Sequence, residues 1–282
     1  MPGIQIVTDS TGYIPPDLVR KYGIQVAPQV LIWGNETLRD GIDILPDAFY
    51  ARLKTASVMP TTSQATVAEF VDLYKKAAAE GRPVLAILLS SKLSGTISSA
   101  VQAKELVPEA QVEIIDSYAT SMAMGYQVLA AARAAESGMA FADVVALARK
   151  AVDRTGVVFV VDTLEFLHRG GRIGGAAKLL GTALNLKPVL ELREGRIEPV
   201  EKIRTKTKAV ARMLDMVEER VKGKSNLRLA AIHAAARGEA QAMLDEAVAR
   251  LKPIEVMVVE ASPVVGTHAG PGTVGLAYST DL

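Results

Sequence analysis

Short apolar runs alternate with longer amphipathic segments over the first half of the chain. Runs of strand length that are rich in β-forming residues occupy residues 4–7, 24–33, 84–89 and 112–116. Residues 66–81 and 124–138 instead carry apolar side chains at the three- and four-residue spacing of a helix that buries one face. Strands that alternate with helices predict a parallel sheet flanked by helices.

The rhythm changes from about Gly156 onward. Residues 188–203 read PVLELREGRIEPVEKI, which predicts a hairpin that turns at Glu194-Gly195. Strand-like runs at 226–235 and 253–262 flank a helical segment at 238–251. A mixed sheet with helices on one face fits this order. We therefore expect an α/β protein with two domains, residues 1–155 and 156–282. No proline-rich, serine-rich or like-charge linker separates them, so they should pack directly and share a cleft.

Composition narrows the class of protein. Of 282 residues, 49% are hydrophobic, which is enough for a sizeable core and an apolar cavity. Only 5% are aromatic and the net charge is +1, so the basic surface and stacking platforms of a nucleic-acid-binding protein are missing. No cysteine is present, which excludes disulfides and thiolate chemistry. We find neither a signal-peptide pattern nor a transmembrane-length apolar run, and expect a cytoplasmic protein.

Three loops at predicted strand ends are rich in hydroxyl groups. They read TDSTG from Thr8, TTSQAT from Thr61 and SSKLSGTISSA from Ser90. Ligands of open parallel sheets bind at the carboxyl ends of the strands, where helix N-termini offer free N–H groups to anions. Capping of the following helices also explains Ser and Thr, but a cap needs only one hydroxyl per helix. The three loops together predict an anion site.

The nucleotide motifs are missing or misplaced. The P-loop pattern does not occur, and the glycines of residues 270–275 match G-x-G-x-x-G only seven residues from the end of the chain. A dinucleotide fingerprint must follow a strand, open a helix and have an acidic residue about 20 positions on. We interpret the match as accidental and expect no cofactor. Without an ATP site, the chain is not a kinase by itself.

The three histidines lie far apart in the sequence. With no thiolate and no H-E-x-x-H motif, we expect no metal site. We interpret His168 and His233 as structural residues. His268 differs because it lies in GTHAGPGTVG, where glycines allow close approach of a ligand to the backbone. Ser94 and His268 could begin a serine-hydrolase site, although LSGT lacks the G-x-S-x-G elbow. A hydrolase or esterase is therefore the alternative function.

Six motifs, taken together and in order, resemble the DegV family of bacterial fatty-acid-binding proteins. They are IVTDSTGYIPPDL, PTTSQAT, LSSKLSGTISSA, IDSYATSMAMG, LEFLHRGGRIGGAAKLLGTALNLKPVLEL and VVGTHAGPGTVGLAY. The resemblance implies a three-layer N-terminal domain with a parallel sheet and a two-layer C-terminal domain with a mixed sheet. It also implies a buried long-chain fatty acid whose carboxyl is presented to a separate ATP-binding fatty acid kinase subunit.

The resemblance also implies which residues form the site. The carboxylate-binding residues of the family fall on Thr62, Ser94 and His268, with second contacts at Ser63, Gly95 and Thr96. Arg172 of GGRI and Arg204 of KIRT match the kinase-facing surface of the family.

These residue types suit a carrier. Neutral hydroxyl donors contribute about 1 kcal/mol each and leave the acid transferable. Affinity must then come from the tail, at about 0.8 kcal/mol per buried CH₂. With its ordinary pKa of about 6.5, the His268 imidazole could donate or accept a proton at the head group near neutrality.

Overall fold

A four-stranded parallel sheet forms the centre of the first half. The computed structural model describes residues 3–180 and 186–282. The strand order is β2-β1-β6-β7, and all three neighbouring pairs are parallel, as the sequence predicted. The strands are β1 (Gln5–Asp9), β2 (Gln25–Ala27), β6 (Val84–Leu88) and β7 (Val112–Asp116).

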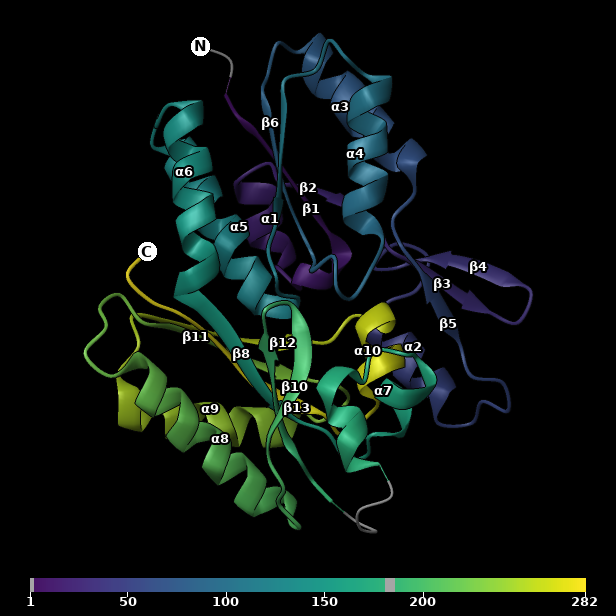
Figure 1. Ribbon diagram of the computed structural model, residues 1–282, viewed down its shortest axis with the longest axis vertical. Helices are drawn as coiled ribbons and strands as arrows, with labels where there is room; N and C mark the ends of the chain where they lie inside the picture. The colour runs from purple at the N-terminus through teal and green to yellow at the C-terminus, as the bar shows by residue number, and fades with distance from the viewer. Residues whose placement is uncertain (1–2, 181–185) are drawn as a thin grey trace.

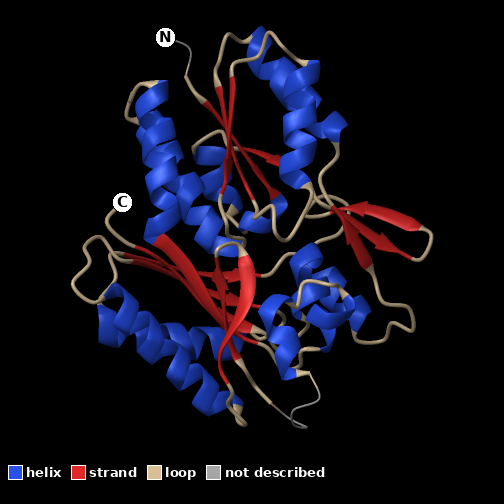
Figure 2. Cartoon of the chain, viewed as in Figure 1, coloured by secondary structure: helices blue, strands red, loops and turns tan. Residues whose placement is uncertain are grey.

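Helices cover both faces of this sheet, which gives the first half three layers (Figures 1 and 2). The helices on one face are α3 (Val67–Ala79) and α4 (Thr96–Leu106), and those on the other are α1 (Pro16–Lys21), α5 (Ser121–Glu136) and α6 (Phe141–Ala151). Val7 packs with the α3 side, whereas its neighbour Ile6 packs with the α5 side. Burial on both faces explains the continuous apolar run of β6, VLAIL, in which all five residues are buried.

The second half contains a six-stranded mixed sheet of order β10-β9-β8-β13-β11-β12. Only β11 and β12 pair in parallel. The hairpin at Glu194-Gly195 is confirmed, and both residues have the positive φ of a tight hairpin turn. The strands are β8 (Thr155–Val160), β9 (Val189–Arg193), β10 (Arg196–Glu201), β11 (Arg228–His233), β12 (Glu255–Glu260) and β13 (Val274–Ser279).

Helix α5 links the two halves. The second sheet carries α8 (Lys206–Val221) and α9 (Arg237–Leu251) on one face, as expected from the sequence. Its other face contacts α5 through β8, β13 and β11. Twelve of the 16 residues of α5 are buried, because the helix lies between two sheets. The two halves therefore pack directly on each other. We keep the boundary at Thr155 as a proposal, since β8 begins there.

A small antiparallel sheet projects beside the parallel one (Figure 1). It consists of β3 (Val30–Trp33), β4 (Glu36–Arg39) and β5 (Thr61–Ser63). The sequence suggested one strand over residues 24–33, but β2 and β3 belong to different sheets. Pro28 lies between them and has no N–H to extend a ladder. The short helices α2 (Pro46–Leu53), α7 (Glu165–Arg169) and α10 (Pro263–Ala269) gather next to this sheet. Three 3₁₀ turns complete the described elements, η1 (Ser10–Gly12), η2 (Val152–Arg154) and η3 (Gly174–Leu179).

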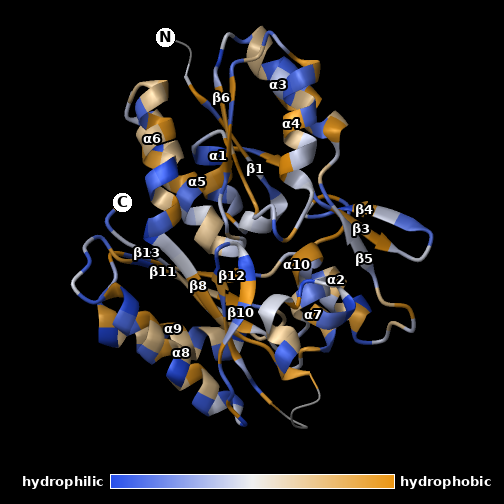
Figure 3. Cartoon of the chain, viewed as in Figure 1, coloured by the Kyte–Doolittle hydropathy of each residue, from blue (hydrophilic) through white to orange (hydrophobic). Residues whose placement is uncertain are grey.

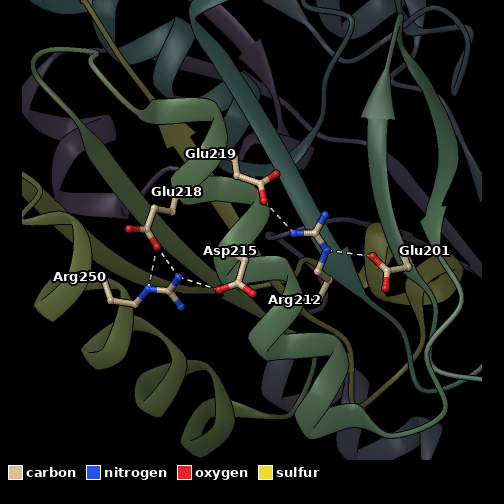
Figure 4. A network of polar contacts seen from close by, with 6 residues as sticks. All are labelled: Glu201, Arg212, Asp215, Glu218, Glu219 and Arg250. Atoms are coloured by element: carbon tan, nitrogen blue, oxygen red, sulfur yellow. Dashed lines mark hydrogen bonds and ion pairs between the residues drawn. The ribbon is translucent and has the colours of Figure 1, made fainter.

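The outer face of α8 and α9 is polar. Figure 3 shows hydrophobic colours along the central strands and mixed colours on these two helices. Arg250 of α9 pairs with Asp215 at 2.7 Å and with Glu218, while Arg212 of α8 contacts Glu201 and Glu219 (Figure 4). Such exposed pairs each contribute little stability. Among the described residues, no helix has the length and apolar character needed to cross a membrane.

Candidate functional site

An apolar cavity lies between the carboxyl ends of β1 and β6 and the second sheet. Its apolar walls come from both halves of the chain and include Leu89, Leu93, Val157, Phe159 and Leu192. The positions open to the centre of a water molecule occupy about 120 Å³, several times the space that one water needs. An apolar space of this kind suits a hydrocarbon chain better than a polar metabolite.

Thr62 and His268 form a hydrogen-bonded pair in the cavity wall. Thr62 lies on β5, opposite Leu31 of β3, and His268 lies in the last turn of α10. Their Oγ1 and Nε2 atoms are 2.8 Å apart. The GTHAGPG segment is therefore partly helical rather than a loop throughout. Ser262 caps α10 by accepting a hydrogen bond from the Val265 N–H, which fixes the direction of the helix.

The His268 imidazole is neutral at neutral pH. Burial, and secondly the positive charge of Arg172, lower the pKa of His268 to about 4. The expectation of a ring that exchanges protons near neutrality is therefore not met, because a charged imidazole is poorly solvated in this buried position. A neutral ring can still donate one hydrogen bond from Nε2–H to Thr62. The Thr62 hydroxyl then has its own hydrogen free for a ligand.

Ser94 is held by a buried chain of side chains. The Gln29 Nε2–H donates to Thr96 Oγ1 at 2.9 Å, and Thr96 Oγ1 lies 2.9 Å from Ser94 Oγ. Gln29 is also anchored through its Oε1, which accepts from the Ala65 N–H. When the donors run from Gln29 through Thr96 to Ser94, the Ser94 hydrogen is free to point at a ligand.

Of the other residues predicted for the site, some line the cavity and some do not. Ser63 lines the cavity and is exposed. Gly95 and Thr96 do not line it, and Thr96 instead lies behind Ser94. Arg172 lines the cavity, with Nε donating to the Leu93 carbonyl and Nη1 to the Gly170 carbonyl. Arg204 is exposed and does not line the cavity.

Three of these residues also face a second, outer cavity. Thr62, Arg172 and His268 line both spaces, so they form the wall between them. The outer cavity is completed by Met59, Phe166, Arg169 and neighbouring residues. Met59 and Arg169 are exposed, whereas the first, inner cavity is lined mostly by buried and half-buried residues. A ligand group held at this wall would therefore face the cavity with the more exposed lining residues.

The geometry does not favour the hydrolase alternative. His268 bonds to Thr62 rather than to Ser94, and its Nδ1 has no hydrogen-bond partner among the described residues. A serine nucleophile needs a base that is itself oriented by a third group. The described part of the chain also holds no group of three or more metal-ligating side chains. His233, interpreted from the sequence as structural, is buried and lines the cavity.

Together, the fold and the site define an α/β protein that contains an apolar cavity with hydroxyl, imidazole and guanidinium groups in one wall. The chain belongs to the DegV family. The family model described as "Uncharacterised protein, DegV family" matches residues 3–281. A DegV domain-containing protein of Clostridium perfringens is 35% identical, and the alignment covers 99% of both chains.

Solved structures of the family superpose closely on this fold. One, described as showing fatty acid binding of a DegV family protein from Thermus thermophilus, is 36% identical, with a TM-score of 0.93 over 99% of both chains. DegV from Bacillus subtilis, described as a fatty acid binding protein, is 33% identical, with a TM-score of 0.93 over the full length of both chains. These matches confirm both the predicted fold class and the predicted family.

Several residues of the cavity have a position or a role that the sequence did not predict. Gln29 follows Pro28 with no motif around it, and only its bonds to Ala65 and Thr96 reveal that it supports Ser94. Arg172 was predicted as a surface residue, and nothing in GGRI indicates that its side chain turns back to Leu93. The hydroxyls of TDSTG and of the Thr120-Ser121 pair did carry a signal, because they stand at strand ends of the same sheet.

Proposed function

We propose that this protein binds a long-chain fatty acid in the inner cavity, with the carboxyl at Thr62, Ser94 and His268. The observation that carries the proposal is the Thr62 and His268 pair in the wall of an otherwise apolar cavity. The fatty acid binding described for the Thermus thermophilus and Bacillus subtilis structures supports it.

The two hydroxyls are suited to a carboxylate. Each can accept a hydrogen bond from a neighbour, Thr62 from the Nε2–H tautomer of His268 and Ser94 from the Thr96 hydroxyl. In that arrangement each hydroxyl has its own hydrogen available for the ligand. Arg172 adds a positive charge in the same wall while its guanidinium bonds to backbone carbonyls. This anchoring keeps the carboxylate near a charge without requiring a direct fork-shaped ion pair.

The tail supplies most of the affinity. At about 0.8 kcal/mol per CH₂, a long acyl chain contributes on the order of 10 kcal/mol before ordering costs are subtracted. We further propose that the protein is a carrier without an activity of its own. It would present the carboxyl through the outer cavity to a separate ATP-binding kinase subunit, which would form the acyl phosphate.

Extraction tests the binding proposal. We expect organic extraction of the purified protein, followed by mass spectrometry, to recover about one long-chain acid per chain. Hydrolysis of short acyl esters by protein that carries no lipid would support the hydrolase instead. Thr62→Val and Ser94→Ala should each weaken retention about three- to tenfold, the effect of one neutral hydrogen bond.

Charge reversal tests the partner surface. Arg204 is exposed and has no role in the cavity, so Arg204→Glu should leave bound lipid unchanged and slow acyl-phosphate formation in a reconstituted assay. Arg172→Glu should reduce both, because Arg172 also lines the cavity. Full phosphorylation of lipid carried by Arg204→Glu would contradict a role for Arg204 at the kinase.

A further inference from the structure

A second polar site lies in the same cavity, at the start of α5. Thr120 precedes this helix, Ser121 begins it, and both line the cavity. Ser121 is 5% exposed. The side-chain oxygens of both residues are closed to solvent and have no hydrogen-bond partner among the described residues. Neither belongs to the head-group wall formed by β5 and α10.

The helix itself adds donors at this place. The Thr120 side chain makes no capping bond, so it leaves the first-turn N–H groups of a 16-residue helix without a side-chain acceptor. The positive end of the helix dipole points the same way. Ser121 also has a φ of 59°, in the left-handed region that residues other than glycine rarely adopt. Backbone strain of this kind is concentrated at ligand sites.

A plain hydrocarbon tail would leave these groups unpaired. The same cavity is also lined by the apolar side chains of Leu89, Val157 and Ile232. Buried hydroxyls that lose water without gaining a partner are costly, so native proteins rarely keep several together. Thr273 shows the ordinary arrangement in this same cavity, because its hydroxyl donates to the Ala269 carbonyl at 2.9 Å.

We propose that the cavity accommodates an acyl chain that carries a hydroxyl or keto oxygen along its length. That oxygen accepts hydrogen bonds from Thr120, Ser121 or the first-turn amides of α5. The inference builds on the proposed function, since it assigns the tail of the same ligand. It makes the protein selective for an oxygenated acid over an unsubstituted acid of equal length.

A panel of acids tests the second site. Affinities of the lipid-free full chain are measured for stearic acid and for monohydroxystearic acids with the hydroxyl at successive positions. We expect at least one hydroxy acid to bind about fivefold or more tightly than stearic acid, the effect of one added hydrogen bond. In Thr120→Val/Ser121→Ala this preference should disappear, while stearic acid binds within about twofold of the wild-type value or more tightly.

Thr273→Val is the matched control, because its hydroxyl is already paired, and it should keep the preference. If stearic acid binds the wild type and no hydroxy acid binds more tightly, the second site is wrong while the proposed function stands. If the double variant loses stearic acid and hydroxy acids equally, Thr120 and Ser121 hold the carboxyl, which also overturns the inference. The wild-type panel decides the question even if the double variant does not fold.

Discussion

His268 lies directly against Gly170: a Cβ atom on this glycine would lie 2.0 Å from the His268 Nδ1. Gly170 ends α7 with a φ of −76°, which any residue can adopt. The glycine is therefore required by space rather than by backbone conformation. This close approach of α7 to α10 fixes the side of the ring opposite Thr62.

Gly170→Ala should displace the His268 ring and break its bond to Thr62. We expect fatty-acid affinity to fall about three- to tenfold, measured by displacement of a fluorescent acyl probe. Gly171→Ala is the matched control. A Cβ there meets no atom within 4 Å, but its φ of +69° makes alanine strained. It should lose about 1 kcal/mol of stability and keep its affinity. Unchanged affinity in Gly170→Ala would contradict the role of the His268 position.

Thr62 and His268 should act as one unit in binding. Each single variant, Thr62→Val or His268→Ala, is expected to weaken fatty-acid binding about three- to tenfold. The double variant should bind fatty acid only slightly more weakly than the single variant of lower affinity, because either change alone already removes the shared bond. Titration calorimetry on all four proteins measures the coupling. Losses that simply multiply would show that the two residues bind the carboxyl independently.

The pKa of His268 should depend on the ligand. Burial lowers the pKa of His268 to about 4, so the unfolded chain takes up a proton first as the pH falls below about 6.5. The contribution of this histidine to stability is therefore present above that value and is lost as the pH falls toward 4. A bound carboxylate should raise the pKa of His268, because it favours the charged ring.

NMR titration of the imidazole measures both states. His268→Gln should remove the stability change between about pH 6.5 and pH 4, since glutamine does not titrate. An unchanged His268 pKa on adding fatty acid would place the carboxyl away from the ring.

The fold was predictable because β-rich runs alternate with helical segments along the chain, and because burial of β6 on both faces gives it a continuous apolar sequence. The packing of α5 against the other face of the second sheet could not be predicted. Helix α5 is apolar enough to lie between two sheets, yet its helical period says nothing about what packs against its second face. Pro28 was the local sign that residues 24–33 form two strands, since it removes a ladder donor.

The candidate site could be predicted in part, because the loops at the strand ends contain more hydroxyl side chains than helix capping requires. Thr66 caps α3 by accepting from the Glu69 N–H, which leaves Thr62 free to meet His268. The distance of 206 residues between these two partners cannot be read from local patterns. The direction of the Arg172 side chain and the neutral state of His268 also depend on tertiary packing, which composition does not record.

The last prediction concerns Asp40, which links the first half of the chain to the helix that carries His268. Its carboxylate accepts a hydrogen bond from Ser10 Oγ at 2.6 Å and one from the Val264 N–H of α10 at 3.3 Å. Burial nevertheless raises the pKa of Asp40 to about 6. Because the folded chain holds this proton more tightly than the unfolded chain, the stability contribution of Asp40 is largest below about pH 3.8 and is lost as the pH rises through about 6.

Asp40→Asn should therefore gain stability relative to the wild type as the pH rises through this window. Asparagine keeps an acceptor for Val264 and can donate to Ser10 instead of accepting from it, so the local bonds survive without a buried charge. Asp43→Asn is the control with the opposite sign, because Arg39 lowers the pKa of the exposed Asp43. Urea unfolding at about pH 4 and about pH 8 measures both variants. If Asp40→Asn is instead less stable than the wild type at the higher pH, the predicted sign is wrong. The hydrogen bonds of the charged carboxylate would then stabilise the fold by more than the burial of its charge costs.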